Sequence, residues 1–146
     1  MTLTVVSMSA CRCTTTSCSP VRRSGSTAFA LAKEIGRLDI GQTVVVKGRA
    51  VLAVEAIEGT DEAIRRGGLL CGTGAVVVKV CKPQQDLRFD LPAIGDLTIR
   101  TMENVKASCL AVEAGKTIII ERETVLREAD RAGIAIIALS DPKDLS

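Results

Sequence analysis

The pentapeptide LAVEA occurs twice in the chain, at Leu52–Ala56 and at Leu110–Ala114. Each copy completes a short apolar run and carries a carboxylate, Glu55 or Glu113, near its end. Runs of this kind, rich in Val, Leu and Ile, are typical of β-strands. A strand sequence that recurs together with its neighbours predicts a fold built from two similar halves.

The first half starts with "TVVVKGRAVLAVEA" (43–56), which predicts two strands joined at a glycine turn. "GTDEAIRRGG" (59–68) follows and predicts a helix that Thr60 caps and that Gly67 and Gly68 end. "GAVVVKV" is apolar almost throughout, as strands buried on both faces are. The half therefore reads as strand, strand, helix, buried strand.

The second half repeats this order. "CLAVEAGKTIII" (109–120) predicts strand, glycine turn, strand, and "IAIIAL" predicts the last strand. Between them, apolar residues at helical spacing predict a helix that Gly133 ends: Val125, Leu126, Ala129 and Ala132. Duplicated strands would leave two like-placed glutamates whether or not they act, so a structural role and a chemical role both remain open for Glu55 and Glu113.

Two further helices complete the expected fold. "STAFALAKEIGRL" (26–38) has apolar residues at helical spacing up to Gly36, and Ile99, Met102 and Val105 have the same spacing. We therefore predict the α/β class, with a mixed sheet built from two similar strand-strand-helix-strand halves and with helices packed on the sheet.

The chain contains no histidine, which narrows its chemistry. Without imidazole there is no Ser-His-Asp or Cys-His nucleophile and no histidine-ligated zinc. Any catalysis must use carboxylates, amines and guanidinium groups, and ligands of this kind suit a hard metal ion such as Mg²⁺ or Mn²⁺ better than zinc or copper. A formal net charge of +2, with two Phe and no Tyr or Trp, argues against binding to nucleic acid.

Residues 1–26 differ in composition from the rest of the chain, being rich in Ser and Thr and free of acidic residues. We expect an atypical disordered leader, or an organelle transit peptide, before a single domain over residues 27–146. Cys71, Cys81 and Cys109 lie in apolar surroundings and form no CxxC pair, which is typical of buried free thiols in a reducing cytoplasm.

The segment "KVCKPQQDLRFDLPAIGD" (79–96) lies between the halves and concentrates charge. It leaves the end of a buried strand, where open α/β sheets bind ligands. In an extended conformation Asp86, Arg88 and Asp90 would share one face above an apolar base of Leu87, Phe89 and Leu91. The carboxylates could hold Mg²⁺ while the guanidinium group pairs with phosphate. The alternative is a row of surface ion pairs that neutralise one another.

Several motifs resemble one known family. "DIGQTVVVKGRAVLAVEAIEGTDEAIRRGG", "VVVKVCKPQQDLRFDLPAIG" and "LAVEAG" are similar to the C-terminal domain of bacterial UDP-2,3-diacylglucosamine pyrophosphatases of the carboxylate-dependent, non-metallophosphoesterase type. The resemblance covers about residues 27–140, and its most specific part is KPxQDxRxD with the Pro and Gly that follow, from Lys82 to Gly95.

The resemblance implies a Mg²⁺-dependent hydrolase of lipid A biosynthesis that cleaves UDP-2,3-diacylglucosamine to 2,3-diacylglucosamine 1-phosphate (lipid X) and UMP. It also implies that an aspartate of the loop is essential, and we assign both Asp86 and Asp90 to catalysis and to the metal ion. The remaining expected site residues have two roles, phosphate binding for Lys79, Lys82 and Arg88 and support for Glu55, Gln85 and Glu113.

Members of this family carry a further α/β domain on the amino-terminal side, and the substrate is expected between the two domains. Residues 1–26 do not resemble that domain, so we expect impaired activity unless another chain supplies it. The alternative is a non-catalytic remnant or assembly module of the same fold. The expected partners are the UDP-linked diacyl amino sugar and either a second copy or a separate N-terminal domain chain. The expected location is the cytoplasm, with peripheral contact at the inner membrane.

Overall fold

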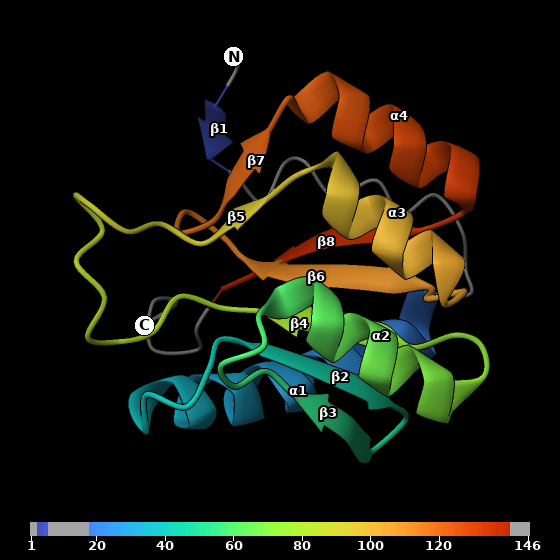
Figure 1. Cartoon of the computed structure of the whole chain (residues 1–146), viewed down its shortest axis with the longest axis horizontal. Helices are drawn as coiled ribbons and strands as arrows, with labels where there is room; N and C mark the ends of the chain where they lie inside the picture. The colour runs from blue at the N-terminus through green and yellow to red at the C-terminus, as the bar shows by residue number, and fades with distance from the viewer. Residues whose placement is uncertain (1–2, 6–17, 141–146) are drawn as a thin grey trace.

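The computed structural model describes residues 3–5 and 18–140. A five-stranded mixed sheet lies at its centre (Figure 1). In the order in which they lie side by side, its strands are β3 (Ala50–Val54), β2 (Thr43–Lys47), β4 (Val76–Lys79), β6 (Cys109–Glu113) and β8 (Ala135–Leu139). The α/β class with a mixed sheet is therefore confirmed.

The direction of the strands decides where a site can form. β2 runs antiparallel to both β3 and β4, whereas β4, β6 and β8 run parallel to one another. The carboxyl ends of β3, β4, β6 and β8 therefore lie along one side of the sheet, which we call the carboxyl edge. Open α/β sheets bind ligands at this edge.

A second, smaller sheet lies beside the first, with the strand order β1-β7-β5. Its strands are β1 (Leu3–Val5), β7 (Ile118–Ile120) and β5 (Ala93–Ile94). β7 pairs antiparallel with β1 and parallel with β5. Because β5 follows the loop after β4, this small sheet fixes the far end of that loop.

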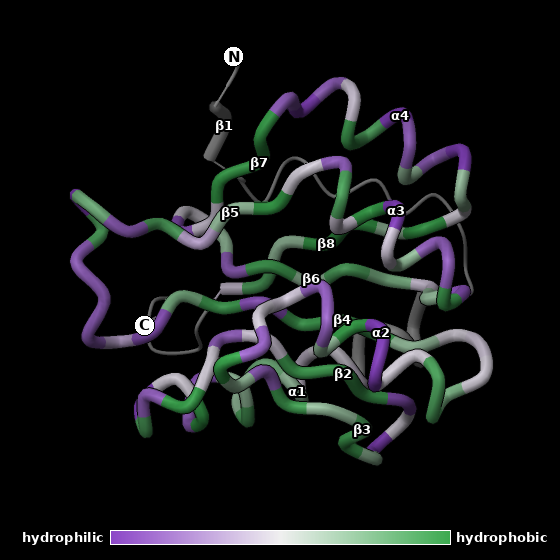
Figure 2. The backbone as a smooth tube through the Cα atoms, viewed as in Figure 1, coloured by the Kyte–Doolittle hydropathy of each residue, from purple (hydrophilic) through white to green (hydrophobic). Residues whose placement is uncertain are grey.

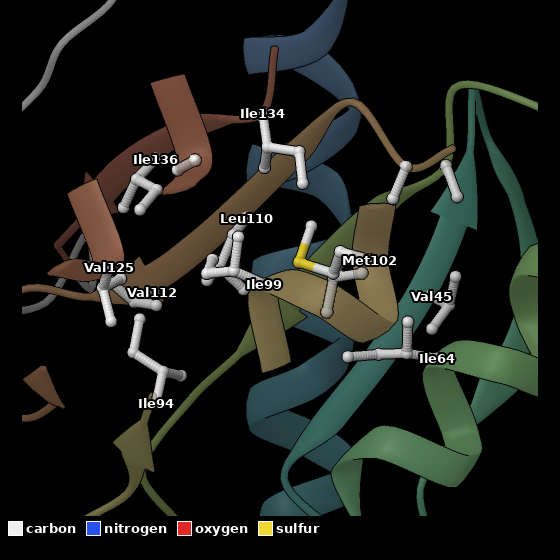
Figure 3. Packing of buried hydrophobic residues seen from close by; sticks show 14 of the residues in the cluster. Val45, Ile64, Ile94, Ile99, Met102, Leu110, Val112, Val125, Ile134 and Ile136 are labelled. Carbon is white, nitrogen blue, oxygen red and sulfur yellow. The ribbon is translucent and has the colours of Figure 1, made fainter. Parts of the chain in front are cut away.

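Four helices pack on the large sheet, at α1 (Cys18–Arg37), α2 (Thr60–Cys71), α3 (Asp96–Asn104) and α4 (Arg122–Ala132). α1 covers one face, where Phe29 and Ala32 meet Val44 and Val78. The other three cover the opposite face, where Figure 3 shows Ile64, Met102 and Val125 in one cluster with side chains of the sheet. In the described part of the chain, no helix is long and apolar enough to cross a membrane.

Figure 2 shows why the sequence folds this way. The central strands are hydrophobic along their length, because helices cover both faces of the sheet. The helices alternate hydrophobic and hydrophilic residues, because only one side of each packs on the sheet.

The two halves share their order of elements but differ in arrangement. β2 and β3 form the predicted hairpin within the large sheet. β6 and β7 are joined by the predicted turn at Gly115, yet β7 belongs to the small sheet. The first LAVEA therefore lies in and just after an edge strand, and the second lies in a strand with neighbours on both sides.

Two helix boundaries differ from the sequence prediction. α1 begins at Cys18 rather than Ser26, and β1 also lies in the predicted leader, whose residues 6–17 lie outside the described residues. α2 runs through Gly67 and Gly68 to Cys71, so the prediction that these glycines end it is wrong. A Cβ at Gly67 would lie 2.7 Å from the Cβ of Val45, and one at Gly68 would lie 2.3 Å from that of Val105. These glycines permit close packing.

Candidate active site

The carboxyl edge brings together segments that are distant in sequence. The loop after β4, residues 80–92, projects beyond the sheet in Figure 1, and we call it the β4–β5 loop. The start of α2 and the turn after β6 lie along the same edge, because they follow β3 and β6. Two buried polar clusters anchor the loop to these neighbours.

The first cluster surrounds Glu113 at the end of β6, whose side chain is fully buried. The Nζ atom of Lys33, from α1, lies 3.0 Å and 3.1 Å from its two carboxylate oxygens, and the Nζ of Lys116 lies 2.9 Å from Oε1. The backbone N–H of Cys81 donates to Oε2 at 2.8 Å. Glu113 thus joins α1, the turn after β6 and Cys81 of the β4–β5 loop.

The beginning of the β4–β5 loop is held against the end of α1. The Nζ of Lys82 lies 2.7 Å from Oδ1 of Asp39, and the side-chain amide of Gln84 donates to the carbonyl oxygen of Gly36 at 2.9 Å. Oε1 of Gln85 accepts the backbone N–H of Lys82 at 3.2 Å. These contacts give residues 82–85 a defined path, and Lys82 lowers the pKa of Asp39 by hydrogen bonding and charge.

The second cluster surrounds Lys79 at the end of β4. Its Nζ donates to the hydroxyl oxygen of Thr60 at 3.0 Å and to the carbonyl oxygen of Ala93 at 2.9 Å. The Thr60 hydroxyl donates in turn to Oε1 of Glu55 at 3.2 Å. Four segments therefore meet at Lys79, namely β4, the start of α2, the residue that follows β3, and β5.

This second cluster is buried but incompletely paired. Lys79 is 6% exposed and Glu55 is 7% exposed. Oε2 of Glu55 and Oδ1 of Asp61 are buried without a hydrogen-bond partner. Burial lowers the pKa of Lys79, and the negative charges of Glu55 and Asp61 oppose that shift.

The middle of the β4–β5 loop is exposed and held by local contacts. The guanidinium group of Arg88 binds both carboxylate oxygens of Asp86, at 3.0 Å and 2.8 Å. Hydrogen bonds from Arg88 lower the pKa of Asp86. The Arg88 guanidinium also lies over the ring of Phe89, 5.4 Å from its centroid.

The loop is not extended, so that premise of the sequence analysis is wrong. Residues 87–89 form a turn in which the backbone N–H of Asp90 donates to the carbonyl oxygen of Asp86 at 2.9 Å. Phe89 is 84% exposed and Leu87 41%, while Leu91 is half-buried, so the three do not form a packed apolar base. The turn brings residues 86 and 90 together by their backbones instead.

The β4–β5 loop offers carboxylates that could bind a cation only together with other ligands, such as phosphate and water. Among the described residues, no group of three or more Cys, Asp or Glu side chains is placed to hold a metal ion. Asp86 and Asp90 offer two carboxylates, and Arg88 already pairs with the first. Mg²⁺ in phosphate sites typically binds one or two carboxylates together with substrate phosphates and water. The loop fits that mode and does not form an all-protein cage.

The predicted residues thus fall into three places. Glu55 and Lys79 share the second cluster, while Asp86, Arg88 and Asp90 share the turn of the loop. Glu113 lies at the centre of the first cluster, next to the segment that carries Lys82 and Gln85.

The sequence analysis missed the contributions of four residues to these clusters, namely Lys33, Thr60, Asp61 and Lys116. Thr60 was predicted only to cap α2, but the N-cap is Gly59 and the Thr60 hydroxyl binds Lys79 and Glu55 instead.

Comparison with known proteins gives two matches. Residues 11–137 match the model of a family described as the LpxI C-terminal domain. The chain is also 40% identical, over 125 residues, to the UDP-2,3-diacylglucosamine pyrophosphatase LpxI of Caulobacter vibrioides. That alignment covers 80% of this chain and 44% of the relative, so the chain spans less than half of the relative's length.

Proposed function

Because the chain belongs to the LpxI C-terminal domain family, we propose that it acts in lipid A biosynthesis by hydrolysing UDP-2,3-diacylglucosamine to 2,3-diacylglucosamine 1-phosphate (lipid X) and UMP. The observation that carries the proposal is the 40% identity to the UDP-2,3-diacylglucosamine pyrophosphatase LpxI of Caulobacter vibrioides. The geometry supports it, because the charged β4–β5 loop lies at the edge of the sheet where α/β folds bind ligands.

Diphosphate hydrolysis requires charge neutralised on the phosphate oxygens and a water molecule held in line with the bond that breaks. In our proposal Asp86 and Asp90 orient that water, and the exposed guanidinium group of Arg88 binds phosphate after exchanging its pairing with Asp86. Lys82 lies at the beginning of the same loop and adds positive charge near the substrate. None of these steps requires imidazole.

Mg²⁺ is the proposed cofactor, held by Asp86 and Asp90 together with the diphosphate of the substrate. When bound, it would neutralise negative charge on the phosphate oxygens. The loop contributes the carboxylates, and the two anchored ends of the loop hold them at the carboxyl edge.

The test is release of UMP from UDP-2,3-diacylglucosamine by the purified chain with Mg²⁺, alone and with the N-terminal part of the Caulobacter relative added. We expect Asp86→Asn or Asp90→Asn to lower the rate by about a hundredfold or more, as loss of a transition-state contact does. Glu62→Gln removes a carboxylate of an exposed pair with Arg65 and is the matched control. Near-normal rates in both aspartate variants would remove these residues from the proposal.

The alternative is a non-catalytic assembly module that keeps the fold and pairs with itself or with a longer relative. The observation that favours it is the pairing of Asp86 with Arg88, which is also what a self-neutralising surface ion pair without a catalytic role would show. UMP release would exclude this alternative. Failure to release UMP both alone and with the added N-terminal part, together with co-elution of the two, would favour it.

A further inference from the structure

The two ends of the β4–β5 loop are joined by one side chain. Lys79 is the last residue of β4, and Ala93 is the first residue of β5. Nζ of Lys79 donates to the carbonyl oxygen of Ala93 at 2.9 Å, across 14 positions of sequence. The loop therefore leaves and rejoins the body of the protein beside the same buried ammonium group.

This ammonium group is in turn fixed to the start of α2. It donates to the hydroxyl oxygen of Thr60, which donates to Oε1 of Glu55, and the hydroxyl of Thr43 lies 3.4 Å from that of Thr60. Thr43 belongs to β2 and is fully buried. The position of Lys79 is therefore set by side chains from β2, the end of β3 and α2 at once.

Burial argues against direct contact of Lys79 with substrate. The residue is 6% exposed, and two of its three N–H donors have protein acceptors. Moving the ammonium outward would leave the Thr60 hydroxyl and the Ala93 carbonyl without these bonds, and unfilled buried polar groups are costly. By contrast, Arg88 is exposed at the middle of the loop.

The returning arm of the loop has two ties, of which the Lys79 bond is one. Its outgoing arm is held by Lys82, Gln84 and Gln85. On the returning side, the carbonyl of Pro92 accepts the backbone N–H of Ile118, which ties the arm to the small sheet. Lys79 adds the tie to the large sheet, and thus to the edge where the other site segments lie.

We propose that Lys79 is a positioning residue, whose buried ammonium group clamps the β4–β5 loop to the start of α2 and so fixes where Asp86 and Asp90 lie. The clamp itself follows from the contacts above, whereas its effect on catalysis rests on the proposed function. Lys79 then acts through the loop and does not bind phosphate.

Hydrogen exchange of the substrate-free chain tests the clamp. In Lys79→Met we expect the backbone N–H groups of residues 86–94, Pro92 excepted, to exchange about tenfold faster or more, because a hydrogen bond from a charged group is lost. Lys47→Met is the matched control, since Nζ of Lys47 also donates to a backbone carbonyl, that of Thr73, at 2.8 Å but at an exposed place. Its loop exchange should equal that of the wild type.

A pair of Thr60 variants tests the same clamp without touching the lysine. Thr60→Ser keeps the hydroxyl and should leave loop exchange unchanged, whereas Thr60→Val removes it and should accelerate exchange of residues 86–94. This pair decides the question if Lys79→Met does not fold. Unchanged loop exchange in a folded Lys79→Met, or in Thr60→Val when Lys79→Met does not fold, would overturn the proposal.

Steady-state kinetics distinguish a positioning role of Lys79 from direct contact with phosphate. For UMP release, a positioning role predicts a lower kcat with KM unchanged in Lys79→Met, and recovery in Thr60→Ser relative to Thr60→Val. A raised KM with normal kcat and normal loop exchange would make Lys79 a substrate ligand and refute the inference. If the wild type releases no UMP under any condition, the proposed function fails, and the exchange measurements still decide the clamp.

Discussion

Glu113 ends a central strand and is fully buried between Lys33 and Lys116, while Glu55 follows an edge strand and shares the hydroxyl of Thr60 with Lys79. Both carboxylate oxygens of Glu113 are hydrogen-bonded, whereas Oε2 of Glu55 has no partner. The same pentapeptide thus carries a fully paired carboxylate in one half and a partly paired one in the other.

The difference comes from the neighbours of each strand. β6 lies between β4 and β8, so its carboxyl end meets the loop after β4 and also the end of α1. β3 lies at the edge of the sheet, where it pairs with β2 and packs against α2. A repeated sequence reproduces the local strand, but the partners of its carboxylate depend on topology.

The largest expected effect is the loss of the Glu113 charge. Glu113→Gln keeps the shape of the fully buried side chain and leaves two partly buried ammonium groups without their carboxylate, so we expect the free energy of unfolding to fall by about 3 kcal/mol. Urea unfolding measures it. Glu62→Gln, which breaks an exposed pair, should lose about 0.5 kcal/mol or less. Equal losses in the two variants would mean that the Glu113 cluster does not stabilise the fold.

A second difference between the halves concerns glycine. Gly133 ends α4 in the left-handed conformation, with φ 70°, as predicted from the sequence, whereas Gly68 lies inside α2 against Val105. In Gly68→Ala, overpacking should therefore lower the free energy of unfolding by about 1 to 3 kcal/mol. The better helix propensity of Ala should offset up to about 1 kcal/mol of that loss. Thermal unfolding checks this, with Leu69→Ala at an exposed position as the control. A more stable Gly68→Ala would show that Val105 can move aside.

The sequence predicted the helices and strands better than the long-range contacts between them. Apolar runs and helical spacing identified the strands of the large sheet and the helices, because these elements bury continuous or periodic apolar surface. The small sheet was not foreseen, since β5 has two residues and β1 three, too few to give a pattern. The pairing of Lys33 with Glu113 spans 80 positions, and no local signal encodes such a contact. The charged loop was found, but its turn was not.

The Lys79 cluster predicts a pH dependence of stability. Burial lowers the pKa of Lys79 from 10.5, so between the lowered value and 10.5 the folded state binds fewer protons than the unfolded state. The contribution of Lys79 to stability therefore rises with pH across that window. The free energy of unfolding of the wild type minus that of Lys79→Met should increase as the pH rises from neutral towards 10.5, the ordinary pKa of a lysine, measured by urea unfolding. A difference that falls with pH would contradict the burial of a charged Lys79.

The smallest expected effect is that of Glu55→Gln. The amide oxygen can still accept the Thr60 hydroxyl, and the variant removes a buried carboxylate oxygen that has no partner. Against this, the new amide N–H needs an acceptor, and the unpartnered Oδ1 of Asp61, around the same ammonium group, is a candidate. Lys79 loses the nearby charge of Glu55 but keeps that of Asp61 and its own two hydrogen bonds, so we expect the free energy of unfolding to fall by about 1 kcal/mol, less than in Glu113→Gln. A loss as large as that of Glu113→Gln would mean that the second oxygen of Glu55 is engaged in solution and that the two LAVEA carboxylates are equivalent after all.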